Sequence, residues 1–129
     1  MTEEAYQRQS QFFGMLSHPV RLRILDILAQ EETCVCHLTA VLQRRQAYVS
    51  QQLATLREAD LISDRKDGLY VYYSLTSPLI AQVLDEGRRF LADLTGDRGF
   101  LQVTMPVHSG IDCSCPRCQA QLSARSATP

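Results

Sequence analysis

The chain lacks the sequence features of several large classes of protein. It has only six glycines and no glycine-rich loop that could cradle a phosphate, and its thiols lack the neighbouring base expected of a catalytic cysteine. No apolar run approaches the roughly 20 residues that span a bilayer, and the first residues show neither the basic nor the apolar region of a signal peptide. We therefore expect a cytoplasmic protein that has no membrane contact and is not an enzyme.

A strong excess of positive charge is also missing. The formal net charge is −1 over 129 residues, so any contact with DNA must come from a local basic patch rather than from the whole surface. With 45% hydrophobic residues, a chain of this length can bury one modest core, which a dimer would help to stabilise. The composition predicts one domain followed by a short tail.

Five cysteines are the most informative residues present. An odd number cannot all pair within one chain, and in a reducing compartment free thiols or metal ligands are expected. Cys34 and Cys36 stand where a short helix should begin, and the N–H groups of a helix start favour the thiolate form. Cys113, Cys115 and Cys118 follow near the end of the chain, and Cys115-x-x-Cys118 has the spacing of a metal-binding knuckle. The pattern predicts a site for a soft ion.

The first half of the sequence has the spacing of helices. Apolar residues recur at intervals of three and four in segments 4–16, 19–30, 36–42 and from about 47 to 59. Pro19 suits a first helical turn, and Thr33 is placed to cap the third segment. The third and fourth segments are joined by a short polar turn, residues 43–46. Two helices joined in this way predict a helix-turn-helix.

The second half predicts a hairpin and one more helix. Alternating residues 62–66 and 69–75 flank Asp67-Gly68, a strong hairpin signal, so a β wing is expected. Ser77-Pro78 then opens a helix to about residue 94, whose apolar face can be covered only by the first helix and a second copy of the chain. The predicted fold is mainly α with a small β-hairpin (α+β), a winged helix-turn-helix in residues 1–95 that dimerises through its terminal helices. Residues 96–129 form a cysteine-containing tail.

The order of these elements, with four local motifs, resembles the ArsR/SmtB family of metal(loid)-sensing winged helix-turn-helix repressors. The resemblance covers roughly residues 10–95, and the motifs are His18-Pro19-Val20-Arg21, Val49-Ser50-Gln51-Gln52-Leu53, Leu61-Ile62 and the wing at 65–75. It implies a homodimer that binds inverted-repeat operator DNA without inducer and releases it when a metal or metalloid binds. It also implies that Cys34 and Cys36 are the family's thiol site at the start of the third helix.

The chain departs from the family pattern in its ion ligands. Thr39 stands where the arsenite sensors that use this helix alone have a third cysteine, and residues 1–33 contain none of the cysteines that cadmium and lead sensors add. The zinc-type site on the last helix needs histidines, and residues 79–94 contain none. The missing ligand is therefore expected from the tail. Asp60 replaces the usual glycine before Leu61, and aspartate tolerates a left-handed turn.

A recognition helix presents the outer face of its first turns to the major groove, where amides and hydroxyls contact base edges. The residues predicted for that role are Gln46, Tyr48, Ser50, Gln51 and Gln52, the last of which replaces a frequent histidine of the family. Basic side chains in the turn before the helix and in the wing are expected to contact phosphates, and these are Arg44, Arg45, Arg65 and Lys66.

The leading hypothesis is a repressor with no obligatory cofactor that leaves operator DNA when As(III) or Sb(III) binds Cys34, Cys36 and tail cysteines. One alternative is the same fold tuned to Cd(II) or Pb(II) by four thiolates, with Zn(II) as a further soft ion that such ligands accept. Another is a thiol redox or persulfide sensor that needs no metal. A zinc-loaded protein-interaction module without DNA binding is the alternative from a different class.

Overall fold

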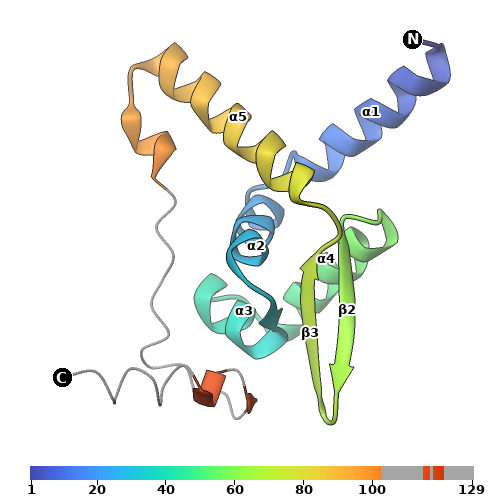
Figure 1. Ribbon diagram of the computed structural model, residues 1–129, viewed down its shortest axis with the longest axis vertical. Helices are drawn as coiled ribbons and strands as arrows, with labels where there is room; N and C mark the ends of the chain where they lie inside the picture. Colours follow the sequence, from blue (N-terminus) through green and yellow to red (C-terminus); the bar gives the residue numbers. More distant parts are fainter. Residues whose placement is uncertain (103–114, 117, 121–129) are drawn as a thin grey trace.

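The computed structural model describes residues 1–102, 115, 116 and 118–120. In chain order these form α1 (Glu3–Leu16), α2 (Pro19–Gln30), β1 (Thr33–Cys34), α3 (Val35–Leu42), α4 (Gln46–Glu58), β2 (Ile62–Asp67), β3 (Tyr70–Leu75), α5 (Pro78–Thr95) and a 3₁₀ turn η1 (Arg98–Leu101), as Figure 1 shows. The predicted winged helix-turn-helix is confirmed. Within the described part of the chain, no helix is long and apolar enough to cross a membrane.

Helices α2, α3 and α4 enclose the main hydrophobic core. Ile24 and Leu25 of α2, Leu38 of α3, and Leu53 and Leu56 of α4 are all completely buried. Burial of these branched side chains is the main stabilising contribution to a fold of this size, and it fixes the three helices against one another. The start of α3 and the recognition helix α4 are thus joined through one packed core.

Two non-glycine residues adopt left-handed backbone conformations, each just after one of the two helices of the helix-turn-helix. Gln43 (φ 54°) ends α3, and Asp60 (φ 60°) lies between α4 and β2, as predicted for an aspartate in place of glycine. In the wing, Asp67 pairs with Tyr70, so the two-residue turn consists of Gly68 and Leu69 rather than Asp67 and Gly68. Gly68 has a φ of 62°, which explains the glycine.

The sheet has a third strand that the sequence did not reveal. Its order is β1-β3-β2, all antiparallel, and Cys34 of β1 lies opposite Tyr72 of β3. The prediction that Thr33 caps α3 was wrong, because its hydroxyl donates to the Glu31 carbonyl at 2.9 Å and Cys34 occupies the N-cap position. The entrance to α3 is thus hydrogen-bonded to the wing.

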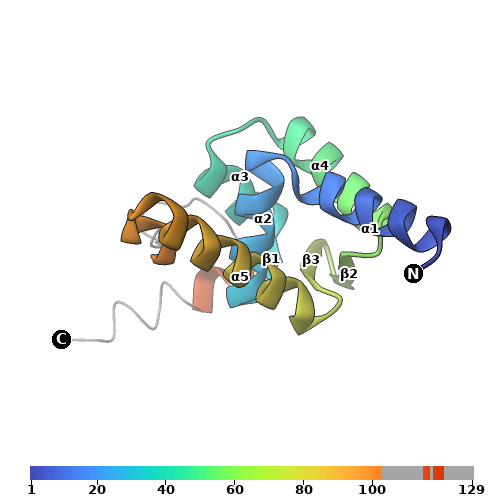
Figure 2. The ribbon, with the colours of Figure 1, turned by 90° about the horizontal axis from the view of Figure 1, so that it is seen from above.

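Helices α1 and α5 extend away from this core in different directions (Figures 1 and 2). Arg88 of α5 donates to Asp26 of α2 at 2.8 Å, and both side chains are about four-fifths buried, so this ion pair fixes α5 to the core. Large apolar side chains are nevertheless exposed on both projecting helices, including Tyr6, Phe13, Leu79, Phe90 and Leu94. These are the two helices that the sequence predicts at the dimer interface.

Candidate thiol site and DNA-binding face

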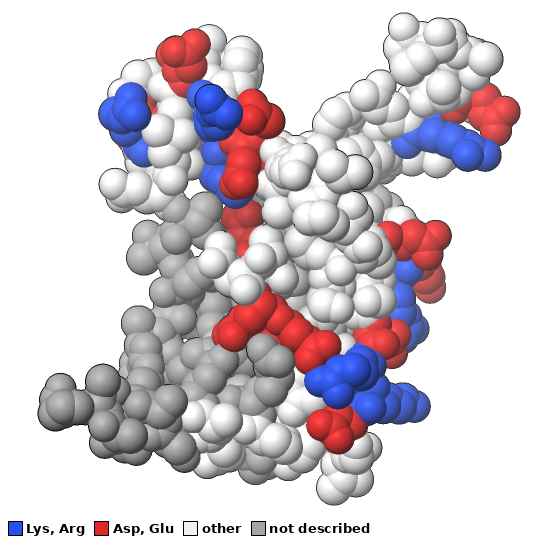
Figure 3. Space-filling model, viewed as in Figure 1, with Lys and Arg blue, Asp and Glu red and all other residues white. Residues whose placement is uncertain are grey.

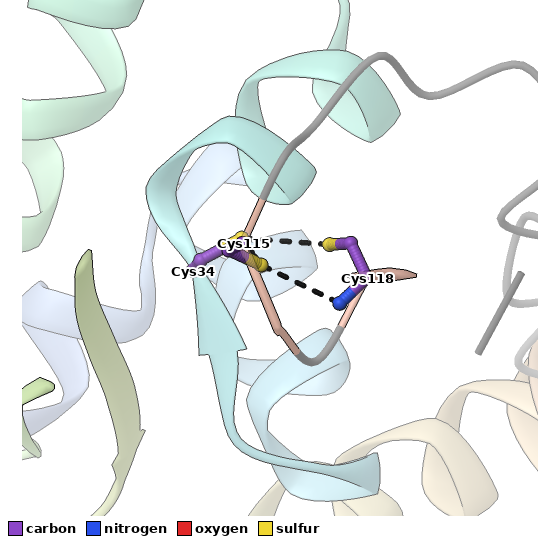
Figure 4. A group of neighbouring side chains, drawn as sticks. All are labelled: Cys34, Cys115 and Cys118. Carbon is purple, nitrogen blue, oxygen red and sulfur yellow. Dashed lines mark hydrogen bonds between the residues drawn. The ribbon is translucent and has the colours of Figure 1, made fainter. Parts of the chain in front are cut away.

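Three cysteine side chains from distant parts of the sequence meet in one cluster. The Cys34 sulfur lies 3.4 Å from that of Cys115 and 3.7 Å from that of Cys118, and all three lie within 4.8 Å of one another (Figure 4). All three side chains are buried, and none of the three cysteines is in a disulfide. The structure therefore brings one cysteine of the helix-turn-helix together with two of the tail, which we call the thiol site.

The backbone around the tail cysteines supports this geometry. The N–H of Cys118 donates to the Cys115 sulfur at 3.4 Å, and the N–H of Gln119 donates to the Cys115 carbonyl at 3.0 Å. Hydrogen bonds from backbone N–H groups to sulfur stabilise the thiolate form that binds metal ions. The Cys-x-x-Cys segment thus presents two sulfurs on one side of a tight turn.

The two remaining predicted ligands differ from these three. Cys36 is exposed at the first turn of α3, its sulfur is 3.4 Å from that of Cys34, and it is disulfide-bonded in this structure. Cys113 lies outside the described residues. The thiol site therefore consists of three free sulfurs, with the sulfur of Cys36 next to it.

The protonation of the three thiols is uneven. Burial raises the pKa of Cys34, although a hydrogen bond from the His37 backbone opposes it, and burial together with the Cys115 sulfur raises that of Cys118. Burial also acts on Cys115, but the hydrogen bond from the Cys118 backbone and the contacts with the sulfurs of Cys118 and Cys34 outweigh it and lower its pKa. Of these three thiols, Cys115 is therefore the one whose thiolate form is most favoured.

The sulfur positions suit a soft ion. Zinc–sulfur bonds of about 2.3 Å in a tetrahedron imply sulfur–sulfur distances of roughly 3.8 Å. The distances of 3.4 Å and 3.7 Å from Cys34 are close to this value. The three convergent, buried sulfurs therefore fit a thiophilic ion in trigonal coordination. After reduction of Cys36, its sulfur next to Cys34 would be a fourth ligand and would fit a four-coordinate ion.

The first turns of α4 form most of the predicted DNA-reading face. Gln46, Ser50 and Gln51 are exposed there, and Arg44 and Arg45 are exposed just before the helix. Tyr48 is only half exposed, since it packs against the core, and the Arg44 guanidinium lies 5.7 Å from the centre of its ring. These side chains are therefore exposed, as the predicted contacts with the groove and the backbone of DNA require.

Gln52 does not share this face, which corrects its predicted role. Its side chain is 8% exposed, and its amide oxygen accepts a hydrogen bond of 2.8 Å from Nε of Arg21 in α2. A buried amide paired in this way cannot reach a base edge. Arg21 stands in the His18-to-Arg21 motif, but no periodicity or spacing indicates that it holds the recognition helix.

In the wing, Arg65 and Lys66 are exposed on β2. Arg65 already has a partner, because its guanidinium donates to both carboxylate oxygens of Glu32, at 2.6 and 3.2 Å. Figure 3 shows the consequence for the surface, where Lys and Arg atoms near the tip of the wing lie beside acidic atoms. Glu32 would have to release Arg65 before this arginine could contact a phosphate.

Comparison with known proteins identifies the family. Residues 18–64 match the model described as "Bacterial regulatory protein, arsR family". The uncharacterised HTH-type transcriptional regulator Rv0081 of Mycobacterium tuberculosis is 36% identical over 98 residues, which cover 75% of this chain and 86% of the relative. The chain belongs to the arsR family. The crystal structure of Rv0081 agrees, with a TM-score of 0.69 at 35% identity over 76% of this chain and 99% of that one.

A second arsR-family relative is the arsenical resistance operon repressor of Escherichia coli, 42% identical over 84 residues that cover 61% of this chain and 71% of the relative. These relatives are transcriptional regulators and repressors rather than enzymes, so the family assignment makes this chain a winged helix-turn-helix regulator of transcription. The resemblance inferred from the sequence motifs is thereby confirmed.

Ion binding by this arsR-family chain should depend on pH. The pKa values of Cys34 and Cys118 are raised, so both thiols are protonated at neutral pH and must lose their protons when an ion binds. Protons therefore compete with the ion, and the apparent affinity should rise with pH by about tenfold per pH unit for each proton released. Competition titrations with Cd(II) at pH 6.5, 7.5 and 8.5 test this. An affinity for Cd(II) that does not change between pH 6.5 and pH 8.5 would show that the thiols are already ionised in the ion-free protein.

Substitution of Gln52 should affect stability rather than DNA recognition. Gln52→Ala leaves the Arg21 guanidinium without its buried partner, and the loss of such a charged hydrogen bond costs about 1.5–3 kcal/mol. Urea unfolding should show this loss, whereas operator affinity of the folded protein should change by less than about threefold. Gln51→Ala, one residue earlier and exposed, should give the opposite pattern. If Gln52→Ala greatly weakened operator binding and left the stability unchanged, Gln52 would be a base-contacting residue after all.

Proposed function

We propose that this chain is a homodimeric repressor that binds inverted-repeat operator DNA in its ion-free form and releases it when As(III) or Sb(III) binds Cys34, Cys115 and Cys118. The observation that carries the proposal is the convergence of three buried cysteine sulfurs at the N-cap of α3, next to the recognition helix. The likeness to a repressor named for arsenical resistance also supports it.

The chemistry of the ligands favours a trivalent metalloid. Soft thiolates select soft ions, and trivalent arsenic and antimony are satisfied by three sulfurs in a trigonal pyramid. The thiol site offers three free sulfurs and no oxygen ligand within the cluster as described. Cd(II) or Pb(II) would instead need a fourth sulfur, for which reduced Cys36 is placed 3.4 Å from Cys34. This cadmium and lead response is the alternative within the same function.

Release of DNA follows from the position of Cys34. An ion that draws Cys34 toward the tail cysteines pulls on the N-terminus of α3, and Leu38 of α3 packs in the same core as Leu53 of α4. A change in the angle of α4 misplaces the exposed residues of its first turns relative to the groove. Coupling energies between two ligand sites are typically about 1–3 kcal/mol, which corresponds to roughly 5- to 150-fold weaker DNA binding.

Dimerisation completes the proposal. Separate apolar faces of α1 and α5 remain exposed, with Phe13 and Phe90 at least half exposed. A second copy of the chain is the partner that the repressor function needs, because a two-fold dimer matches the symmetry of an inverted-repeat operator.

The deciding experiment uses the reduced full-length chain bound to a fluorescent fragment of the DNA upstream of its own gene. Arsenite, antimonite, Cd(II), Pb(II) and a persulfide donor are titrated separately while anisotropy reports release. Release by arsenite or antimonite at about one ion per thiol site supports the proposal. Release by Cd(II) and Pb(II) alone would select the four-thiolate alternative. Failure of the protein to bind any inverted repeat would instead favour the alternative of a zinc-loaded protein-interaction module.

A thiol redox or persulfide sensor is the second candidate, and the disulfide-bonded state of Cys36, whose sulfur lies 3.4 Å from that of Cys34, favours it. In that case an oxidant or persulfide would take two electrons and two protons from a pair of thiols as the sulfur–sulfur bond forms. Release by the persulfide donor without any metal, accompanied by a mass change that dithiothreitol reverses, would establish this function instead.

A further inference from the structure

The two basic side chains of the wing differ in their surroundings. Arg65 and Lys66 are neighbours on β2, both are exposed, and both are predicted to contact phosphates of DNA. Arg65 has two carboxylate partners, Glu32 and Asp67, whereas Lys66 makes no ion pair with any residue that the structure describes. The strand thus carries one cation that is available to DNA and one that is occupied.

Carboxylates face all three nitrogens of the Arg65 guanidinium. Nε and Nη2 donate to the two carboxylate oxygens of Glu32 at 3.2 and 2.6 Å, and Nη1 lies 3.9 Å from Oδ2 of Asp67. One face of the guanidinium lies over the ring of Tyr72, 4.9 Å from its centre. A guanidinium binds a phosphate through the same fork of two parallel N–H···O bonds. Glu32 therefore occupies the edge of Arg65 that a DNA phosphate needs.

Glu32 is the more firmly placed member of this ion pair. It belongs to the two-residue connection between α2 and β1, and the next residue, Thr33, pairs with Tyr73 of β3. The Thr33 hydroxyl also donates to the Glu31 carbonyl at 2.9 Å, which fixes the backbone on the other side. The side chain of Glu32 is 23% exposed, against 52% for Arg65. Arg65 is therefore the partner that can move away when the pair separates.

We propose that Glu32 is an autoinhibitory residue of the DNA-binding face: its carboxylate occupies Arg65 in the free protein and competes with a DNA phosphate for this guanidinium. The wing then contacts the DNA backbone through Arg65 only when the ion pair separates, so Glu32 holds the affinity for DNA below the value that the same face would otherwise reach. This inference rests on the proposed binding of operator DNA and is independent of which ion is the inducer.

The test is a double-mutant cycle on the ion pair. Glu32→Gln keeps the length of the side chain but removes the charge that holds Arg65, and Arg65→Ala removes the guanidinium for which carboxylate and phosphate compete. The affinity of the reduced, ion-free, full-length chain for fluorescent DNA from upstream of its own gene is measured by anisotropy. The wild type, both single variants and the double variant are compared, and thermal unfolding shows whether each is folded.

We expect Glu32→Gln to bind DNA about 2- to 5-fold more tightly for each protomer, and hence up to about 25-fold more tightly as a dimer, which is the scale of an exposed ion pair. In the Arg65→Ala background the same substitution should give no gain, because the guanidinium that it releases is absent. The plot of log affinity against log salt concentration should steepen in Glu32→Gln by up to about 0.9 for each protomer, as expected for one more phosphate contact.

Asp67→Asn is the matched control for the loss of a negative charge. The Asp67 side chain is 60% exposed, and its carboxylate lies 3.9 Å from Arg65 without the two short hydrogen bonds that Glu32 accepts. This substitution should change the affinity for DNA by less than about twofold. Equal gains for Asp67→Asn and Glu32→Gln would show a general effect of charge and would overturn the inference.

The remaining outcomes separate the inference from the proposed function. If Glu32→Gln tightens binding equally with and without Arg65, or gives no gain in a protein that binds its operator, Glu32 does not compete for Arg65 and the inference is overturned while the proposed function stands. If neither the wild type nor any variant binds duplex DNA, the proposed function fails, and the competition for a phosphate fails with it.

Discussion

Replacement of Cys34 by serine should abolish the release of operator DNA by arsenite. Of the three sulfurs of the thiol site, that of Cys34 comes from the winged helix-turn-helix, and it lies within 3.7 Å of those of Cys115 and Cys118. Loss of a mere supporting contact at a metal site costs 10- to 100-fold in affinity, so loss of this ligand should cost more than about 100-fold. Isothermal titration with arsenite and anisotropy of labelled operator DNA measure both effects.

Cys36→Ser is the matched control, since it removes a neighbouring cysteine that is outside the three-thiol cluster. It should retain most of the arsenite response but lose any four-sulfur binding of Cd(II). Cys118→Ser should lose the arsenite response as Cys34→Ser does, because the described part of the tail then supplies one sulfur to the thiol site rather than two. An arsenite response that survives in Cys118→Ser but disappears in Cys36→Ser would show that the ligands are the helix pair and not the three-thiol cluster.

Two charges on the exposed apolar face of α5 should convert the protein to a monomer. Phe90 and Leu94 are 64% and 67% exposed, one helical turn apart, and a second copy of the chain is their proposed partner. Phe90→Asp combined with Leu94→Asp would place two carboxylates in that contact. A monomer holds one half-site only, and loss of bivalent binding typically costs 10²–10⁴-fold, so operator affinity should fall at least about 100-fold.

Sedimentation equilibrium at micromolar concentration gives the oligomeric state for this prediction, and anisotropy gives the affinity. Gln82→Asp adds a carboxylate at an exposed polar position of the same helix and should leave a dimer with wild-type affinity. Thermal unfolding of both variants shows whether the fold is retained. A double variant that remains dimeric would exclude this face of α5 from the interface.

Local sequence patterns were sufficient for most of the fold. The bounds of α2 could be predicted to the residue, because Pro19 marks its start and the apolar spacing ends at its last turn. β1 could not be predicted, since two residues are too short for an alternating pattern and become a strand only by pairing with β3. The hydrogen bond between Gln52 and Arg21 could not be predicted for a related reason. Whether a polar residue of α4 faces solvent or Arg21 depends on the rotation of α4 about its axis relative to α2.

The sequence predicted that tail cysteines join Cys34 and Cys36, but not which of them do. Cysteine spacing alone could not show that Cys115 and Cys118 are the ones beside Cys34, because sequence separations of more than 80 residues are closed only by the tertiary fold. Nor does any local pattern place Tyr72 among the thiols. That position follows from the register between β1 and β3, which depends on the unpredicted strand.

Two of the three gathered sulfurs, those of Cys115 and Cys118, lie beyond residues 18–64, the segment that matches the family model. Under the proposed function, the part of the molecule that would select the ion is thus largely separate in sequence from the part that would select the operator. Point changes or grafts in a stretch of a few tail residues would then alter which ion is sensed without altering the promoter that is controlled. In that case the chain would serve as a scaffold for genetically encoded sensors of different thiophilic ions.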